Sequence, residues 1–172
     1  MYTPLTWGGV DWYGCDDDLT WERLDAPQPH LPRHLRRVLI LDVENVCPSS
    51  RRPVRALARL NAVLRAAGPV DHIVTASAGS QYERLDEVLQ RAGVHSHIRC
   101  GNRPNAADRV LIEQARRFAG EGDCEVIVAS NDHGFRVIAH MPGVRRLVLI
   151  THPDLATARS LLRVASELRV AA

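Results

Sequence analysis

The sequence predicts a three-layer α/β/α domain with a mainly parallel sheet of about five strands. Two observations support this fold class. Short segments made almost wholly of apolar residues recur along the chain, and segments with helical apolar spacing separate them. A strand that is apolar throughout is buried on both faces, as in a parallel sheet covered by helices. Right-handed crossovers between such strands place helices on both faces of the sheet.

The individual elements follow from apolar spacing and from glycine and proline positions. Strands are predicted at 37–41, 70–76, 94–99, 124–129 and 146–150. Helices are predicted at about 53–67, 81–92, 105–119, 135–140 and 155–168. Ser49 or Ser50 is a candidate N-cap for the first of these helices, and Gly68-Pro69 ends it.

The chain divides into an N-terminal arm, residues 1–34, and one domain, residues 35–172. The arm contains all three tryptophans and a proline-rich stretch at 27–32, without sustained periodicity. This many large aromatic residues indicates that part of the arm packs on the domain or on a protein partner. The length of 172 residues suits a single hydrophobic core.

Composition narrows the function classes. All 22 basic residues are arginine, so P-loop nucleotide sites and Schiff-base or pyridoxal-phosphate enzymes, which need a lysine, are excluded. Arginine instead suits bidentate phosphate binding. The four cysteines are scattered, and neither a signal peptide nor an apolar run of membrane-spanning length is visible, so we expect a cytoplasmic protein that does not bind membranes.

Acidic and amide residues follow the two most apolar strands. Asp42, Glu44 and Asn45 come directly after the first, and Ser130-Asn131-Asp132 comes directly after the other. The carboxyl ends of parallel strands meet at one edge of the sheet, where ligands bind. Asp108 lies in the first turn of the helix that precedes the second strand, so its loop can bring it to the same edge.

Carboxylates that converge at such an edge repel one another unless a cation lies among them. Asp42, Asp108 and Asp132, with Glu44 as a further oxygen donor, suit a hard divalent ion, Mg²⁺ or Mn²⁺. Such ions orient and activate water and neutralise phosphodiester charge in phosphoryl chemistry. Each acid also has a plain structural explanation, as a cap of a turn or of a helix N-terminus.

Three motifs in order resemble the NYN domains of the PIN-like nuclease superfamily. They are D-x-x-N at Asp42 and Asn45, an aspartate opening a mid-domain helix at Asp108, and S-x-D-x-x-F over 130–135. The resemblance covers about residues 37–150. It implies a metal-dependent ribonuclease with a Rossmann-like sheet, in which the aspartates at 42, 108 and 132 and Asn45 form the catalytic site.

The chain departs from that family pattern at Gly134, where the family has a second acid, and at Asn131, where it has a glycine. Glu44 or Asp154 are candidates to supply the missing carboxylate. Two alternatives follow: a catalytically impaired domain that binds RNA or a protein, and, with less support, a phosphatase of the haloacid-dehalogenase type. That phosphatase needs an aspartate where Glu44 stands and a lysine that the chain lacks.

The resemblance also implies RNA, single-stranded or structured, as the partner. Arg51, Arg52 and Arg103 flank the acidic residues in sequence and are candidate phosphate contacts, while Ser130 and Asn131 are candidate polar contacts. Arg55 and Arg59 are expected on a solvated helix face. His133 is expected to be a loop histidine and not a metal ligand. The oligomeric state stays open, with a homodimer among the options.

Overall fold

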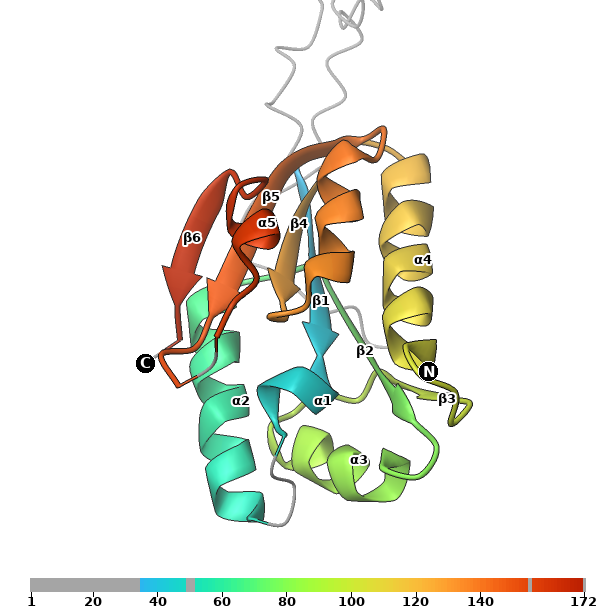
Figure 1. Ribbon diagram of the computed structural model, residues 1–172, viewed down its shortest axis with the longest axis vertical. Coiled ribbons are helices and arrows are strands. Elements are labelled where there is room, and N and C mark those ends of the chain that lie inside the picture. Colours follow the sequence, from blue (N-terminus) through green and yellow to red (C-terminus); the bar gives the residue numbers. More distant parts are fainter. Residues whose placement is uncertain (1–34, 49–51, 155, 172) are drawn as a thin grey trace, which may run out of the picture. The chain divides into compact units, whose positions relative to one another are not determined.

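The computed structural model describes residues 35–48, 52–154 and 156–171 (Figure 1). The expected N-terminal arm, the phosphate contact at Arg51 and the N-cap at Ser49 or Ser50 lie outside these residues. Within the described ranges no helix is both long and apolar enough to cross a membrane.

Six parallel strands form one sheet in the order β3-β2-β1-β4-β5-β6, one strand more than expected. The strands are β1 (Arg36–Asp42), β2 (His72–Ala78), β3 (His97–Cys100), β4 (Cys124–Ala129), β5 (Val144–Thr151) and β6 (Glu167–Val170). The strand order reverses between β1 and β4, as in a Rossmann-like sheet. Because Leu41 pairs with Ala129, the residues that follow the two strands begin side by side at this reversal.

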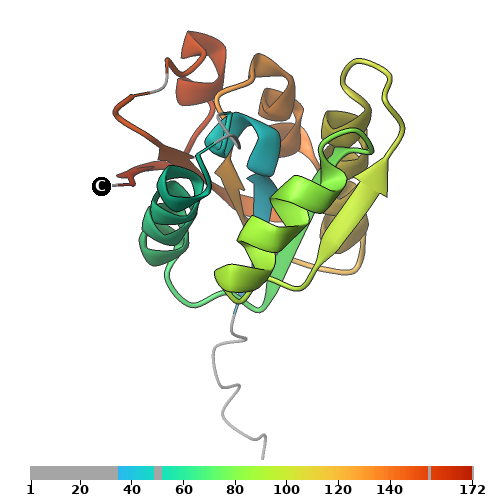
Figure 2. The ribbon, with the colours of Figure 1, turned by 90° about the horizontal axis from the view of Figure 1, so that it is seen from below.

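Two layers of helices cover the sheet. On one face lie α1 (Val43–Val46), α2 (Pro53–Ala67) and α3 (Tyr82–Arg91). On the other lie α4 (Ala106–Gly120), the 3₁₀ helix η2 (His133–His140) and α5 (Arg159–Leu162). Figure 2 looks onto the edge where the strands end, with α1 near its centre.

The core consists of two apolar clusters, one on each face of the sheet. In β1, Leu39 and Leu41 pack with the first layer and Val38 and Ile40 with the second, and all four are fully buried. Alternate residues of a strand point to opposite faces, so an uninterrupted apolar run supplies both clusters. The predicted three-layer α/β/α fold is therefore confirmed.

The predicted helix over 155–168 is wrong. In its described residues, 156–168, the segment contains the one-turn α5 and the start of β6, which pairs in parallel with β5. The Ser166 N–H donates to the Leu147 carbonyl at 2.8 Å, and the Arg169 guanidinium donates to the Ala67 carbonyl at 2.9 Å. These hydrogen bonds to distant parts of the chain stabilise the segment more than a short isolated helix on the surface would.

Candidate active site at the β1/β4 strand ends

Asp42 is the last residue of β1 and is only 4% exposed. Its Oδ2 accepts a hydrogen bond from the Ser130 hydroxyl at 2.7 Å. Its Oδ1 accepts from the Asn45 backbone N–H at 3.2 Å, so Asp42 is also the N-cap of α1. The structural and functional explanations of this residue are therefore compatible, since the cap holds the carboxylate in a fixed orientation.

The environment of Asp42 raises its pKa from 3.8 to about 6. Burial is the largest cause, because it disfavours the charged form, and the charges of Asp108 and Glu44 act in the same direction. The hydrogen bonds from Ser130 and from the Asn45 N–H partly oppose the rise in pKa. Apart from burial, the groups that change the pKa of Asp42 are thus other acids and neutral hydrogen-bond donors.

Ser130→Ala should raise the pKa of Asp42 above 6, because the variant loses the hydroxyl that stabilises the ionised carboxylate. The ¹³C resonance of the Asp42 carboxyl, followed by NMR as a function of pH, reports the value directly. Ser80→Ala is a suitable control, since Ser80 is exposed and uses only its backbone N–H in its contact with Asn102. An unchanged or lower pKa in Ser130→Ala would contradict this account.

The turn after β4 is held by its own polar side chains. The Ser130 hydroxyl accepts from the Asp132 N–H at 3.1 Å, and Asp132 Oδ1 accepts from the Gly134 N–H at 2.6 Å, which makes Asp132 the N-cap of η2. Phe135 is fully buried beneath this turn and anchors η2 in the second cluster. His133 is exposed and touches Asp132 at 3.3 Å.

Asn131 connects the two strand ends. Its Nδ2 donates to Asn45 Oδ1 at 3.0 Å, and its Oδ1 accepts from the Thr157 hydroxyl at 2.8 Å. Its backbone carbonyl also accepts from the Ala158 N–H at 3.1 Å. Both predicted amide residues, Asn45 and Asn131, are therefore at the site. The hydrogen bond between them holds the two strand ends together.

Asp108 reaches the same edge, because α4 begins there after β3 and runs back along the second face. Burial raises its pKa, and the charges of Asp132 and Glu44 raise it further. The charge of Asp108 also opposes ionisation of Asp42. The four acids predicted from sequence are thus brought close enough to repel one another.

A cavity of about 340 Å³ opens beside these acids, between the end of β2 and the start of α4. Glu44, Asp108 and Arg103 are among its lining residues. Glu44 Oε1 accepts from the Ala78 N–H at 3.1 Å, which fixes the carboxylate at the cavity wall. Arg103 is exposed, as is Arg52 at the N-cap of α2, so both are accessible to a ligand.

Carboxylate and amide oxygens gather at this edge, and oxygen donors of these two kinds are those that hard divalent cations prefer. In the described part of the chain, no three histidine, cysteine or acidic residues form a ready-made coordination group. Mg²⁺ commonly keeps several of its waters and is held by only one or two carboxylates directly, so it does not require such a group.

Asp154 is not part of this carboxylate group. Its Oδ2 forms ion pairs with Arg55 at 3.3 Å and with Arg59 at 3.1 Å, and these arginines hold the pKa of the carboxyl below its usual value. Of the two candidates to supply the missing acid, the structure therefore leaves Glu44.

A serine–histidine–aspartate relay occurs elsewhere in the fold. The Ser77 hydroxyl lies 2.9 Å from His97 Nε2, and His97 Nδ1 lies 3.1 Å from Asp86 Oδ1. Tyr82 stacks on the imidazole with 4.3 Å between ring centres. Ser77 is fully buried, so no substrate reaches its hydroxyl and the relay serves to join β2, β3 and α3.

No family model and no curated protein matches this sequence. Among solved structures, the chain is similar to a protein of unknown function from Vibrio parahaemolyticus. The two share 20% identity over 80% of this chain and 94% of the other, with a TM-score of 0.56. A haloacid dehalogenase-like hydrolase from Streptococcus pneumoniae matches at 12% identity over 67% of this chain and 58% of the other, with a TM-score of 0.38, which is too low to indicate a shared fold. The first likeness supports the α/β fold alone.

Proposed function

We propose that the chain is a divalent-metal-dependent ribonuclease of the PIN-like type, with its active site where β1 and β4 end. The observation that carries this proposal is the convergence of four acids at one edge. Burial, with the charges of Asp108 and Glu44, raises the pKa of Asp42 to about 6, and the charge of Asp132 helps to raise the pKa of Asp108. A buried acid with a strongly raised pKa at the strand reversal of a Rossmann-like sheet is typical of a functional site.

In this proposal the carboxylates at 42, 108 and 132 hold Mg²⁺ or Mn²⁺, with Glu44 as a further oxygen donor. The bound ion supplies activation of water and neutralisation of phosphodiester charge. Ser130 and Asn45 keep the Asp42 carboxylate in one orientation through their hydrogen bonds of 2.7 and 3.2 Å.

RNA binding falls to the exposed arginines and polar groups at the same edge. Arg103, in the wall of the 340 Å³ cavity, and Arg52 would contact backbone phosphates, with Arg51 next in sequence. Ser130 is 1% exposed and Asn131 is committed to Asn45 and Thr157, so these two residues support the strand ends more than they meet RNA. We place this activity in the cytoplasm.

The chain should cleave single-stranded RNA in the presence of Mn²⁺, and cleavage should stop when EDTA removes the ion. Asp108→Asn should lower the rate by roughly a hundredfold, because the ion would lose one of the carboxylates proposed to hold it. Asp123→Asn is the matched control, because Asp123 is exposed and precedes the opposite end of β4. Cleavage that persists in EDTA and in Asp108→Asn would overturn the proposal.

Gly134 supports a second candidate, an RNA- or protein-binding domain without catalysis. A side chain there would begin only 3.1 Å from Asp132 Oδ1, so the turn is built around a glycine where the resembled family has an acid. Calorimetry separates the two candidates. If Mn²⁺ binding is undetectable while single-stranded RNA still binds, the binding domain is favoured and the nuclease is excluded.

A further inference from the structure

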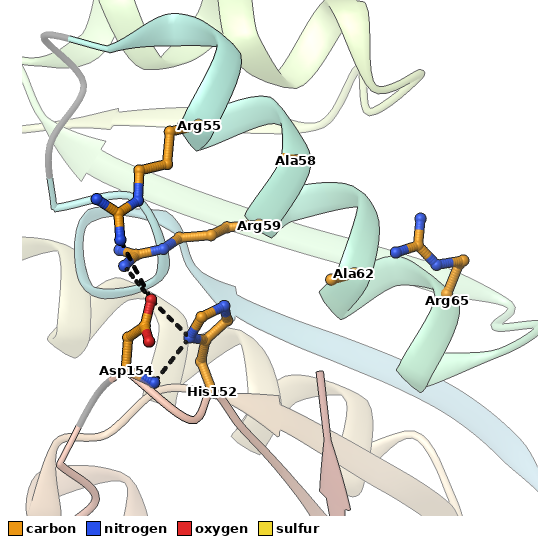
Figure 3. A pocket seen from close by; sticks show the side chains of 7 residues that line it. All are labelled: Arg55, Ala58, Arg59, Ala62, Arg65, His152 and Asp154. Atoms are coloured by element: carbon orange, nitrogen blue, oxygen red, sulfur yellow. Dashed lines mark hydrogen bonds and ion pairs between the residues drawn. The ribbon is translucent and has the colours of Figure 1, made fainter. Parts of the chain in front are cut away.

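A second cavity, of about 290 Å³, lies between α2 and the segment that follows β5. Figure 3 shows its lining, which comprises Arg55, Ala58, Arg59, Ala62, Arg65, His152 and Asp154. The three arginines come from α2, and the first two are one helical turn apart. Arg55 and Arg59 face the single carboxylate of Asp154, whereas Arg65 lies farther along the helix. Two guanidinium groups beside one carboxylate give this part of the cavity a surplus of positive charge.

Asp154 already holds an anionic oxygen between two arginines. Its Oδ2 lies 3.3 Å from Arg55 and 3.1 Å from Arg59, and both contacts meet on that one atom (Figure 3). A carboxylate oxygen shared by two guanidinium groups occupies a position suited to a phosphate oxygen. The arrangement therefore has the donors of a phosphate site, with an internal carboxylate bound in it.

The internal carboxylate is easy to displace. The Asp154 side chain is 52% exposed and that of Arg55 is 53% exposed, and ion pairs this exposed contribute little to stability. Arg59, by contrast, is only 11% exposed, so its guanidinium is held in place by the surrounding structure. A phosphate would gain a preorganised donor in Arg59 and would meet a weak competitor in Asp154.

His152 adds a further donor. Its Nδ1 accepts the Asp154 backbone N–H at 3.1 Å, so the neutral ring carries its hydrogen on Nε2. The side chain is 17% exposed and lines the cavity. Histidine and arginine together offer both neutral and charged donors, a combination that suits the several acceptor oxygens of a phosphate.

We infer that this cavity is a phosphate-binding site in which a phosphate group displaces the Asp154 carboxylate from Arg55 and Arg59. The site opens at the same sheet edge as the carboxylates. Because β5 is two strands from β1, roughly 10 Å of sheet separates the two strand ends. The phosphate can belong to a small molecule or to RNA, and only the RNA source rests on the proposed function.

The test is a titration of the full chain, without divalent metal, using inorganic phosphate as the first probe. The second probe is a single-stranded 2′-O-methyl oligoribonucleotide, which cannot be cleaved through its 2′-hydroxyl groups. Arg59→Gln should weaken phosphate binding by at least about tenfold, as expected for loss of a charge-assisted hydrogen bond. Asp154→Asn should tighten it several-fold, because the competing anion is gone. Arg116→Gln, on the exposed face of α4, should leave it unchanged.

Opposite effects of two substitutions in one cavity cannot arise from misfolding, so the pair tests the site even if Arg59→Gln is unstable. Unchanged phosphate affinity in both variants would overturn the inference. If phosphate competes with the oligoribonucleotide, the natural source is RNA. If Arg59→Gln weakens phosphate binding alone, the source is a small phosphorylated molecule. Either result supports the site, and neither depends on cleavage, so a failure of the nuclease proposal is seen separately.

Discussion

Asp42→Asn should abolish metal-dependent cleavage and at the same time stabilise the protein by about 1–2 kcal/mol at pH 7.5. The activity should fall because the variant loses the most buried of the proposed metal-holding carboxylates. The stability should rise because asparagine, which is close in shape, carries no charge in a site where burial opposes one.

The direction of this stability change follows from the two pKa values of the Asp42 carboxyl. The carboxyl has an ordinary pKa of 3.8 when unfolded and a pKa of about 6 in the fold, so between these values the folded protein binds more protons than the unfolded chain. Stability from this group is therefore fully present below pH 3.8 and is lost as the pH rises through 6. The whole loss is roughly 3 kcal/mol, and part of the gain in the variant is offset by its altered hydrogen bond with Ser130.

Urea unfolding at pH 4 and at pH 7.5 measures both effects. At pH 7.5 the free energy of unfolding should be larger for the variant than for the wild type. The difference should nearly vanish at pH 4, because Asp42 is then largely protonated in the fold. Added Mn²⁺ should stabilise the wild type but not the variant, because only a site that binds the ion gains from mass action. Asp123→Asn should stay within about 0.5 kcal/mol of the wild type. A variant that is less stable at pH 7.5 would contradict the electrostatic account.

Gly143→Ala should destabilise the fold by roughly 3 kcal/mol or more, the largest stability effect that we expect from a single methyl group. Gly143 has φ +91°, and a Cβ there would lie 2.1 Å from the carbonyl oxygen of Ala119 near the end of α4. The obstacle is backbone, so it cannot rotate away. The Gly143 carbonyl also accepts the Cys124 N–H at 2.8 Å where β4 begins, so the strain reaches a central strand.

Gly93→Ala separates this clash from the cost of the backbone conformation. Gly93 has φ +77° and would have no atom within 4 Å of an added Cβ, so its substitution should cost only about 1–2 kcal/mol. Chemical denaturation of both variants gives the comparison. Equal losses would mean that positive φ alone accounts for the effect and that the Ala119 contact is relieved at little cost.

Sequence patterns were sufficient to predict the elements that are completely buried. They were not sufficient for elements whose contacts are with residues far away in the sequence. The β1 and β4 runs are buried on both faces, so their apolar residues identify them without ambiguity, and the acids that follow them were placed correctly at one edge. The placement of Asp108 at this edge depends on the path of the chain after β3. Its position at the start of a helix only suggests that path.

The features missed from sequence depend on contacts between residues far apart in the chain. Arg59 meets Asp154 across 95 positions, so local spacing indicated only a solvated helix face. β6 is an edge strand whose pairing with β5 and contact with the Ala67 carbonyl come from other parts of the fold. The apolar residues of 155–168 fit a helix equally well, and those tertiary contacts decide against it.

Asn131 stands where the resembled family has a glycine, and this difference gives the site an added physical property. A glycine has no side chain with which to reach Asn45 and Thr157, whereas the Asn131 amide joins α1 to the segment after β5 through two hydrogen bonds. Local unfolding of the C-terminal segment would therefore remove a support of the strand ends that carry Asp42 and Asp132. The acidic edge and the segment around Thr157 and Ala158 thus belong to one cooperative unit, although that segment contributes no acid to the edge.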